Sequence, residues 1–135
     1  MRILILAAAL IATLGSAYAD TRAVEMKNLA RYQKYAGDPV ESFDVWQPIY
    51  QWQSLGPDYV AVWSAVNKVY ILKVSQPCVN LENARAIAVT SQMQHKVTRR
   101  FDYVDFDRQH CQITEIRPID YKTMLKADEK APASS

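Results

Sequence analysis

Glycine is scarce in this chain, with three in 135 residues, and neither sign of charge dominates. Gly15 falls in an apolar N-terminal run, which leaves Gly37 and Gly56 for the remainder of the sequence. A glycine-rich phosphate loop and a G-x-S-x-G nucleophile elbow are therefore excluded, because each needs glycines close together. The formal net charge of +2 gives no strongly basic chain, so we predict no nucleic-acid partner. We find no cofactor motif and predict no cofactor.

Hydrophobic residues make up 50% of the chain and charged residues 22%, which is the composition of a folded globular protein. These fractions exclude an intrinsically disordered chain and a collagen-like chain. A length of 135 residues allows one ordinary domain. The sequence therefore predicts a single folded unit.

The one long apolar run lies at the N-terminus, where a basic residue precedes the stretch 3–14. Small side chains follow at Ala17 and Ala19, a spacing typical of a secretory signal peptide that is cut after Ala19. The alternative is an uncleaved membrane anchor, but the run is shorter than the roughly 20 residues that span a bilayer. We predict that residues 1–19 are a signal peptide. The exported chain then begins at Asp20 and keeps no transmembrane segment.

Only two cysteines are present, Cys78 and Cys111. In an exported protein a disulfide between them is the default, because the compartment is oxidising. Their spacing excludes a C-x-x-C redox pair. A metal site would need further ligands, and His95 and His110 do not lie at zinc-finger offsets. We predict a Cys78–Cys111 disulfide and no metal.

Helical patterns occupy both ends of the exported chain, and strand patterns lie between them. Helices are predicted over residues 22–35 and 121–126, with one helical turn over residues 81–84. Strands are predicted over residues 43–46, 49–55, 59–63, 69–74, 86–90, 97–106 and 111–116. Pro118 is expected to end the last strand, because proline cannot donate a hydrogen bond to a neighbouring strand.

Both faces of the strands between Tyr59 and Val74 are apolar, so the sheet should be covered on both sides or closed on itself. The predicted fold is mainly β (α+β). It is a small antiparallel barrel or bent sheet of six or seven short strands, with an N-terminal helix packed across it and a short C-terminal helix. Residues 20–126 form a single disulfide-stapled β-rich domain. Residues 127–135 are rich in Ala, Lys, Pro and Ser, and are expected to form a disordered tail.

A set of short motifs runs through the chain from Gly37 to Lys126. They are Ala36-Gly37-x-Pro39-Val40-x-Ser42-Phe43, Trp52-x-x-Leu55, Val60-Ala61-Val62-Trp63, Tyr70-Ile71-Leu72, Pro77-Cys78, Leu81 with Ala84, Ala86-Ile87, Arg100-Phe101-Asp102 and Cys111-x-Ile113-x-x-Ile116-Arg117-Pro118-Ile119-Asp120. The set resembles an uncharacterised family of small secreted proteins of Gram-negative bacteria that carry a domain of unknown function. This resemblance implies an envelope location, here the periplasm, and a paired Cys78 and Cys111. It implies no activity.

The densest group of polar side chains is Asp102-x-x-Asp105-x-Asp107-x-x-His110. It lacks the glycine and the terminal glutamate of a calcium loop. A strand with one solvated face, followed by a turn, explains the group more simply than a metal site does. Asp102 and Asp105 would serve a hydrolase only if they converged in a cleft and burial raised the pKa of one of them.

Aromatic and amide side chains alternate around residues 46–53. On a strand, Tyr50 and Trp52 project from the same face and could form a platform for a sugar ring or a peptide, with Gln51 beside them. The alternative is that these rings fill the core, as they often do in small β domains. We expect Trp52 and Trp63 to be core residues, and Tyr50 and Trp46 to be partly exposed.

The absence of a recognisable catalytic group favours a non-enzymatic periplasmic module that binds a protein or an envelope component. The candidate ligand platform consists of Trp46, Tyr50, Gln51 and Trp52, and no catalytic residue is predicted. The alternative hypothesis is an envelope-directed hydrolase that uses carboxylates such as Asp102 and Asp105.

Overall fold

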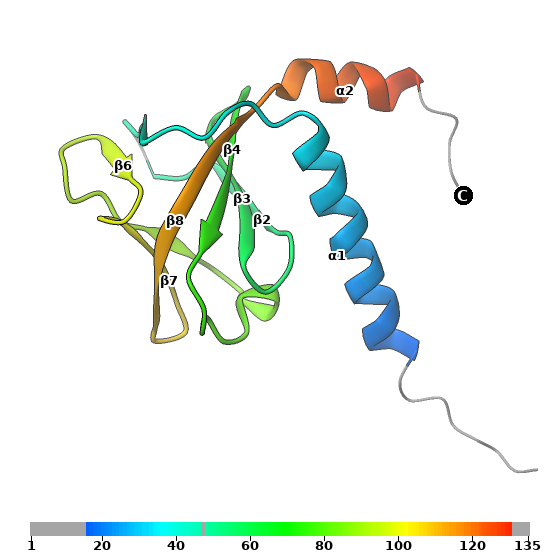
Figure 1. Ribbon diagram of the computed structural model, residues 1–135, viewed down its shortest axis with the longest axis horizontal. Helices are drawn as coiled ribbons and strands as arrows, with labels where there is room; N and C mark the ends of the chain where they lie inside the picture. The colour runs from blue at the N-terminus through cyan, green and yellow to red at the C-terminus, as the bar shows by residue number, and fades with distance from the viewer. Residues whose placement is uncertain (1–15, 47, 131–135) are drawn as a thin grey trace, which may run out of the picture.

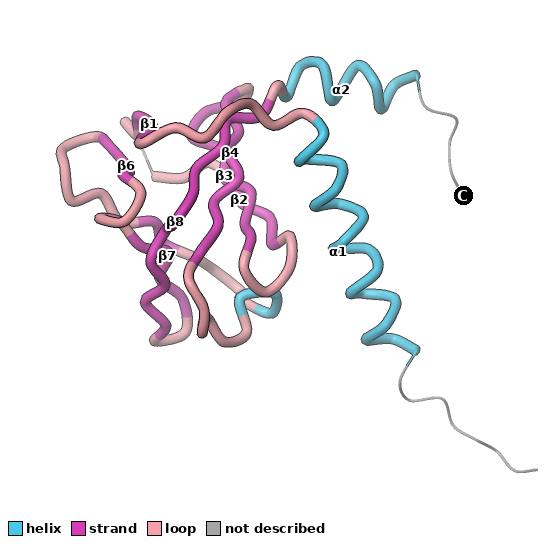
Figure 2. The backbone as a smooth tube through the Cα atoms, in the orientation of Figure 1, coloured by secondary structure: helices cyan, strands magenta, loops and turns pink. Residues whose placement is uncertain are grey.

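The computed structural model describes residues 16–46 and 48–130, and this part of the chain is mainly β with two α-helices (Figure 1; Figure 2). In chain order the elements are α1 (Ser16–Lys34), β1 (Ser42–Asp44), β2 (Gln51–Ser54), β3 (Tyr59–Ala65), β4 (Lys68–Val74), the 3-10 turn η1 (Leu81–Asn83), β5 (Ala88–Val89), β6 (Lys96–Thr98), β7 (Tyr103–Phe106), β8 (Gln109–Ile119) and α2 (Tyr121–Lys130).

Six strands form one antiparallel sheet in the order β2-β3-β4-β8-β7-β5, and this sheet curls into a half-barrel. The pairing register shifts between Trp63 and Ala65 and between Lys73 and Val74. Such irregularities increase the local twist of a strand. The strands β1 and β6 pair separately as a two-stranded ribbon, called the β1–β6 ribbon below. The predicted fold class, a bent antiparallel sheet with a helix at each end, is confirmed.

Side chains of β3 and β4 alternate between two buried clusters, one on each face of the sheet. The cluster on the ribbon face holds Phe43, Val60, Val62, Leu72, Val97 and Ile113, with Leu81 of η1. The cluster on the helix face holds Tyr32, Ala61, Trp63, Ile71 and Met124. Each such large side chain contributes about 1.5–3 kcal/mol when it is fully buried. The sheet is therefore covered on both faces, as its apolar strands predict.

The β1–β6 ribbon is fixed to the sheet by stacked aromatic rings. Phe43 of β1 is 4% exposed and lies parallel to Tyr70 of β4, with 4.3 Å between ring centroids. Across the ribbon, Phe43 pairs with Val97 of β6, which is fully buried. The ribbon thus covers the core on this face of the sheet.

Two helices cover the other face, and a ring of α1 contacts the centre of the sheet. The Tyr32 ring meets Trp63 edge to face at a centroid distance of 6.3 Å, and its hydroxyl donates to Gln53 Oε1 over 3.0 Å. Arg31 forms an ion pair with Asp128, which joins α1 to α2. Figure 1 shows α1 beside the sheet and α2 near the C-terminal end of α1.

One sequence prediction is wrong over residues 97–106, where a single long strand was expected. The segment forms β6 and β7, separated by a turn. Arg100 has a φ of +70°, which lies in the left-handed region that strands do not use. The Thr98 carbonyl accepts the N–H of Asp102 over 2.9 Å, and the Asp102 side chain accepts the N–H of Thr98 over 2.6 Å. Side-chain bonds of this kind compete with a strand ladder, and the apolar pattern does not reveal them.

A second correction concerns Pro118, which lies inside β8 rather than ending the last strand. Pro118 is opposite Tyr70 in the β4–β8 register, and its carbonyl accepts the N–H of Gly37 over 2.8 Å. The nitrogen and carbonyl of one strand residue face the same neighbour. The missing N–H of Pro118 therefore faces the loop at Gly37, and the β4–β8 pairing needs no donor there.

The ends of the chain differ in part from the predicted boundaries. α1 begins at Ser16, and α2 continues to Lys130, through residues 127–130 of the predicted tail. Residues 1–15 of the predicted signal peptide and residues 131–135 of the predicted tail lie outside the described residues. Within the part of the chain that the structure describes, no helix is both long enough and apolar enough to cross a membrane.

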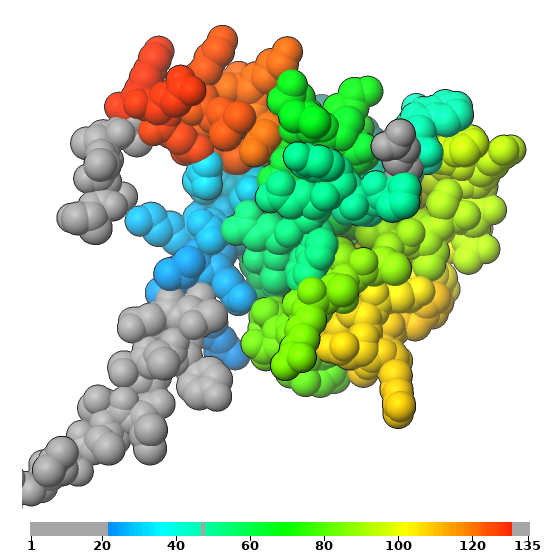
Figure 3. All heavy atoms as spheres, turned by 180° about the vertical axis from the view of Figure 1, so that it is seen from behind, coloured from blue at the N-terminus to red at the C-terminus, as the bar shows by residue number. Residues whose placement is uncertain are grey.

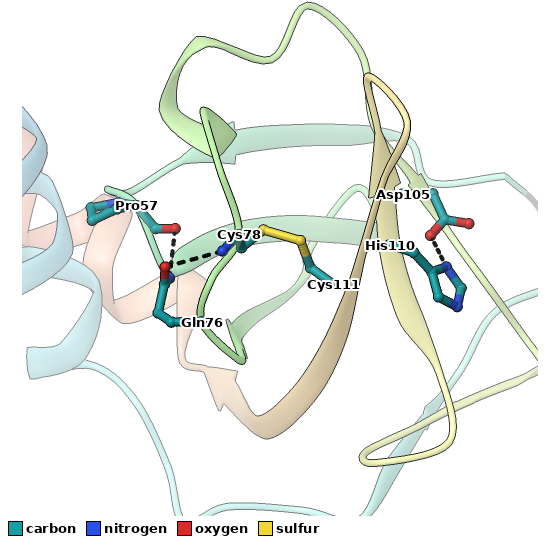
Figure 4. Close-up of a disulfide and its surroundings, with 6 residues drawn as sticks. All are labelled: Pro57, Gln76, Cys78, Asp105, His110 and Cys111. Atoms are coloured by element: carbon teal, nitrogen blue, oxygen red, sulfur yellow. Dashed lines mark hydrogen bonds and ion pairs between the residues drawn. A yellow bond between two sulfur atoms is a disulfide. The ribbon is translucent and has the colours of Figure 1, made fainter.

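The predicted disulfide between Cys78 and Cys111 is present, and it joins the segment after β4 to β8 (Figure 4). Both cysteines are 3% exposed. The Gln76 amide fixes the same segment, because its nitrogen donates to the Pro57 carbonyl and its oxygen accepts the Cys78 N–H, each over 3.1 Å. A closed loop with a sequence separation of 33 stabilises a domain by about 3–4 kcal/mol on the chain-entropy model.

Candidate functional site

A pocket of about 450 Å³ lies where the segment that follows β1 meets the turn between β3 and β4. Its lining residues are Asp44, Trp46, Pro48, Tyr50, Ser64, Ala65, Val66 and Lys68. Figure 3 shows this face of the molecule, with the turquoise segment that precedes β2 near the green turn between β3 and β4. The volume lies in the range of small-ligand sites.

Trp46 is a large hydrophobic residue that is strongly exposed, at 73%. Its indole nevertheless has one partner in the protein, because it stacks on the His95 imidazole at a centroid distance of 4.3 Å and an interplanar angle of 23°. His95 lies in the turn between Met93 and Lys96, with a φ of +58°. Its carbonyl accepts the Val45 N–H over 2.8 Å. One face of the indole therefore rests on the protein, while Trp46 also lines the pocket.

Tyr50 contributes the second exposed ring, at 64%, and Val66 adds an apolar side chain that is 63% exposed. The Tyr50 N–H donates to the Trp63 carbonyl over 2.9 Å, which fixes the backbone from which this ring projects. Val66 lies in the turn between β3 and β4. The rings and the turn together give the pocket apolar walls that face solvent.

The polar groups of the pocket differ in charge and hydrogen-bonding character. Asp44 brings a carboxylate, Lys68 an ammonium group and Ser64 a hydroxyl. The Asp44 carboxylate also influences Tyr70 of β4: burial raises the pKa of the Tyr70 hydroxyl, and the negative charge of Asp44 raises it further. The pocket can therefore both accept hydrogen bonds from a ligand and donate them to it.

The structure brings only part of the predicted platform to this pocket. Trp46 and Tyr50 line it and are exposed, as expected. Trp52 is half-buried against the core of the ribbon face, and Trp63 is 3% exposed. Gln51 is exposed but does not line the pocket. Trp52 and Gln51 point to opposite faces of β2, because neighbouring strand residues alternate.

Sequence reasoning missed the lining residues of β1 and of the turn between β3 and β4. Asp44 is near Tyr50 in sequence but belongs to no motif. The other missed residues, Ser64, Val66 and Lys68, lie 14 to 18 residues after Tyr50. One signal was available, since Val66 is an apolar side chain in a two-residue hairpin turn, where polar residues are usual.

Asp102, a carboxylate of the hydrolase hypothesis, is fully buried and accepts three hydrogen bonds. Its Oδ1 accepts the Thr90 hydroxyl over 2.9 Å and the Gln92 N–H over 2.7 Å, and its Oδ2 accepts the Thr98 N–H over 2.6 Å. These donors lie on both sides of the turn that carries His95. Asp102 therefore ties that turn to the sheet, and its oxygens are already bonded inside the protein.

Asp105 lies in β7 on the face opposite the buried Val104 and Phe106, whereas Asp102 precedes the strand and is itself buried. Asp105 pairs with Nδ1 of His110, the residue opposite it in the β7–β8 register (Figure 4). The His110 ring stacks on Tyr103 with 3.6 Å between ring centroids. Asp107 lies in the exposed turn that joins β7 to β8, with a φ of +42°. Among the described residues, no three His, Cys, Asp or Glu side chains are grouped so that they could hold a metal ion.

The chain belongs to a family of unknown function, DUF6491, whose sequence model matches residues 1–135. No curated protein matches the chain, and no solved structure matches it either.

The two aspartates should differ sharply when each is replaced by its neutral isostere. Asp102→Asn places an amide N–H₂ against buried backbone donors, so we expect it to lower the free energy of unfolding by roughly 2–4 kcal/mol. Asp105→Asn changes only a partly exposed contact with His110, so we expect a loss below about 1 kcal/mol. Urea denaturation of both variants measures the difference. Equal stability of Asp102→Asn and the parent would contradict the structural role of Asp102.

Proposed function

We propose that this protein is a non-enzymatic module of the bacterial periplasm, and that it binds a protein or an envelope component in the pocket beside Trp46. The observation that carries the proposal is that Trp46 and Tyr50, two strongly exposed aromatic side chains, line one pocket together. Exposed aromatic rings are costly in water and are enriched where proteins bind their partners.

The support of Trp46 by His95 strengthens this proposal. A ring that is already held in place loses little conformational freedom when a ligand stacks on it, so more of the contact energy goes into affinity. The stack of indole on imidazole and the bond from Val45 to the His95 carbonyl provide such support. These contacts support a preorganised binding surface at Trp46.

The hydrolase hypothesis has no comparable support. It requires two carboxylates that face each other across a substrate. Asp102 is buried and bonded to three donors, while Asp105 pairs with His110 on the partly exposed face of β7. We therefore assign neither aspartate to the function of the protein.

Loss of the pocket rings should abolish binding without unfolding the protein. We expect Trp46→Ala and Tyr50→Ala to change the free energy of unfolding by less than about 1 kcal/mol, because both side chains are largely exposed. Affinity capture with the tagged mature chain, from periplasmic and membrane extracts, should lose its specific partner with either variant. Phe101→Ala is the matched control, since Phe101 is 66% exposed and does not line the pocket. Undiminished capture by the folded Trp46 and Tyr50 variants would contradict the proposal.

Export to the periplasm gives a separate expectation for the N-terminus. The small residues Ala17 and Ala19 should direct cleavage before Asp20, so the intact mass of the exported chain should correspond to residues 20–135. A variant with Ala17→Leu and Ala19→Leu should keep residues 1–19, because bulky side chains do not suit signal peptidase. An exported parent chain that retains residues 1–19 would show that the export signal is not cleaved there.

A further inference from the structure

Two backbone N–H groups beside the pocket are already bonded inside the protein. The Val45 N–H donates to the His95 carbonyl and the Tyr50 N–H to the Trp63 carbonyl, over 2.8 Å and 2.9 Å. Pro48, between them, has no N–H. A peptide that adds as a strand is held mainly by main-chain hydrogen bonds. Val45, Pro48 and Tyr50 therefore offer no free N–H to such a peptide, so we look to the side chains of the pocket for recognition.

The side chains that line the pocket match the two surfaces of a sugar ring. One surface of a pyranose carries C–H groups and packs on an aromatic face, which Trp46 and Tyr50 offer. Its hydroxyls each donate and accept hydrogen bonds. The Asp44 carboxylate accepts, the Lys68 ammonium donates, and the Ser64 hydroxyl does both.

The exposure of the rings fits one unit of a longer chain better than an enclosed small molecule. Trp46 is 73% exposed and Tyr50 is 64% exposed, so neither ring is roofed by the protein. Small molecules are usually bound with most of their surface buried. A sugar that stacks on these rings could continue into solvent at both ends.

We infer that the pocket binds a saccharide, with a sugar ring stacked on Trp46 and its hydroxyls bonded to Asp44 and Lys68. This inference rests on the proposed function, since it names the ligand class of the same pocket. Tyr50 forms the second wall. His95 is a positioning residue, because it holds the indole and does not itself line the pocket.

The chain contains three tryptophans, so the indole N–H resonances in an NMR spectrum of the mature protein separate the pocket from the core. We would titrate the ¹⁵N-labelled mature chain with three neutral trisaccharides, built of β-1,4-linked N-acetylglucosamine, of α-1,4-linked glucose and of β-1,4-linked glucose. A decaproline peptide serves as the peptide probe, because proline-rich peptides dock on aromatic grooves. We expect at least one trisaccharide to shift the Trp46 resonance in a saturable way at millimolar concentration. The Trp63 resonance should not move.

Three variants test the assigned roles of the side chains. Trp46→Ala should abolish saccharide binding, which is read from the backbone amide resonances of the pocket because this variant lacks the Trp46 indole. Phe101→Ala should leave binding unchanged. His95→Asn should weaken it by roughly threefold to tenfold, because asparagine tolerates the left-handed backbone of the turn but removes the ring below Trp46. An affinity unchanged by His95→Asn would refute the positioning role.

A Trp46 resonance that moves with decaproline and with no trisaccharide would overturn the saccharide assignment. A Trp46 resonance that no probe moves would also overturn the saccharide assignment. The capture experiment then shows whether the binding module itself is wrong. If capture of a partner still depends on Trp46 and Tyr50, the binding module stands with a different ligand. If capture does not depend on these rings, the binding module fails together with the saccharide.

Discussion

The neighbouring strands β3 and β4 are apolar on both faces, and the rest of the structure follows from the need to cover both. A single helix layer could cover only one side of such a sheet. The helices α1 and α2 cover it through Tyr32 and Met124, and the β1–β6 ribbon covers the other side through Phe43 and Val97. The disulfide and η1 close the remaining part of the ribbon face, where Cys78, Cys111 and Leu81 are buried together.

The candidate site is a consequence of how the ribbon is attached. Packing of Phe43 on Tyr70 brings the chain after β1 against the turn between β3 and β4. The three hydrogen bonds that Asp102 accepts hold the turn that carries His95, and His95 in turn holds Trp46. The buried Asp102 carboxylate thus supports the pocket by holding this turn in place, and it takes no part in a reaction there. The candidate site lies at the rim of the core, where the His95 turn and the hairpin between β3 and β4 flank the exposed rings.

Much of this architecture follows from local patterns in the sequence, but the site follows from them only in part. The apolar runs of β3 and β4 and the single pair of cysteines predict the two-sided sheet and the disulfide. The split of residues 97–106 and the course of β8 through Pro118 depend on tertiary partners, namely the Asp102 carboxylate and the loop at Gly37, which no periodicity records. Aromatic density predicts that Trp46 and Tyr50 matter. It does not predict Asp44 or Lys68, because only the folded ribbon brings them to the same pocket.

A photo-cross-linking side chain in the pocket tests the central claim, that this surface is where the protein meets its ligand. Val66 and Val79 are exposed to similar extents, 63% and 55%, but only Val66 lines the pocket. With p-benzoylphenylalanine at either position, irradiation of living cells should give a specific adduct at position 66 and not at position 79. The adduct at position 66 should disappear when Trp46→Ala is added. Equal adducts at both positions, or an adduct at position 66 that survives Trp46→Ala, would contradict the account.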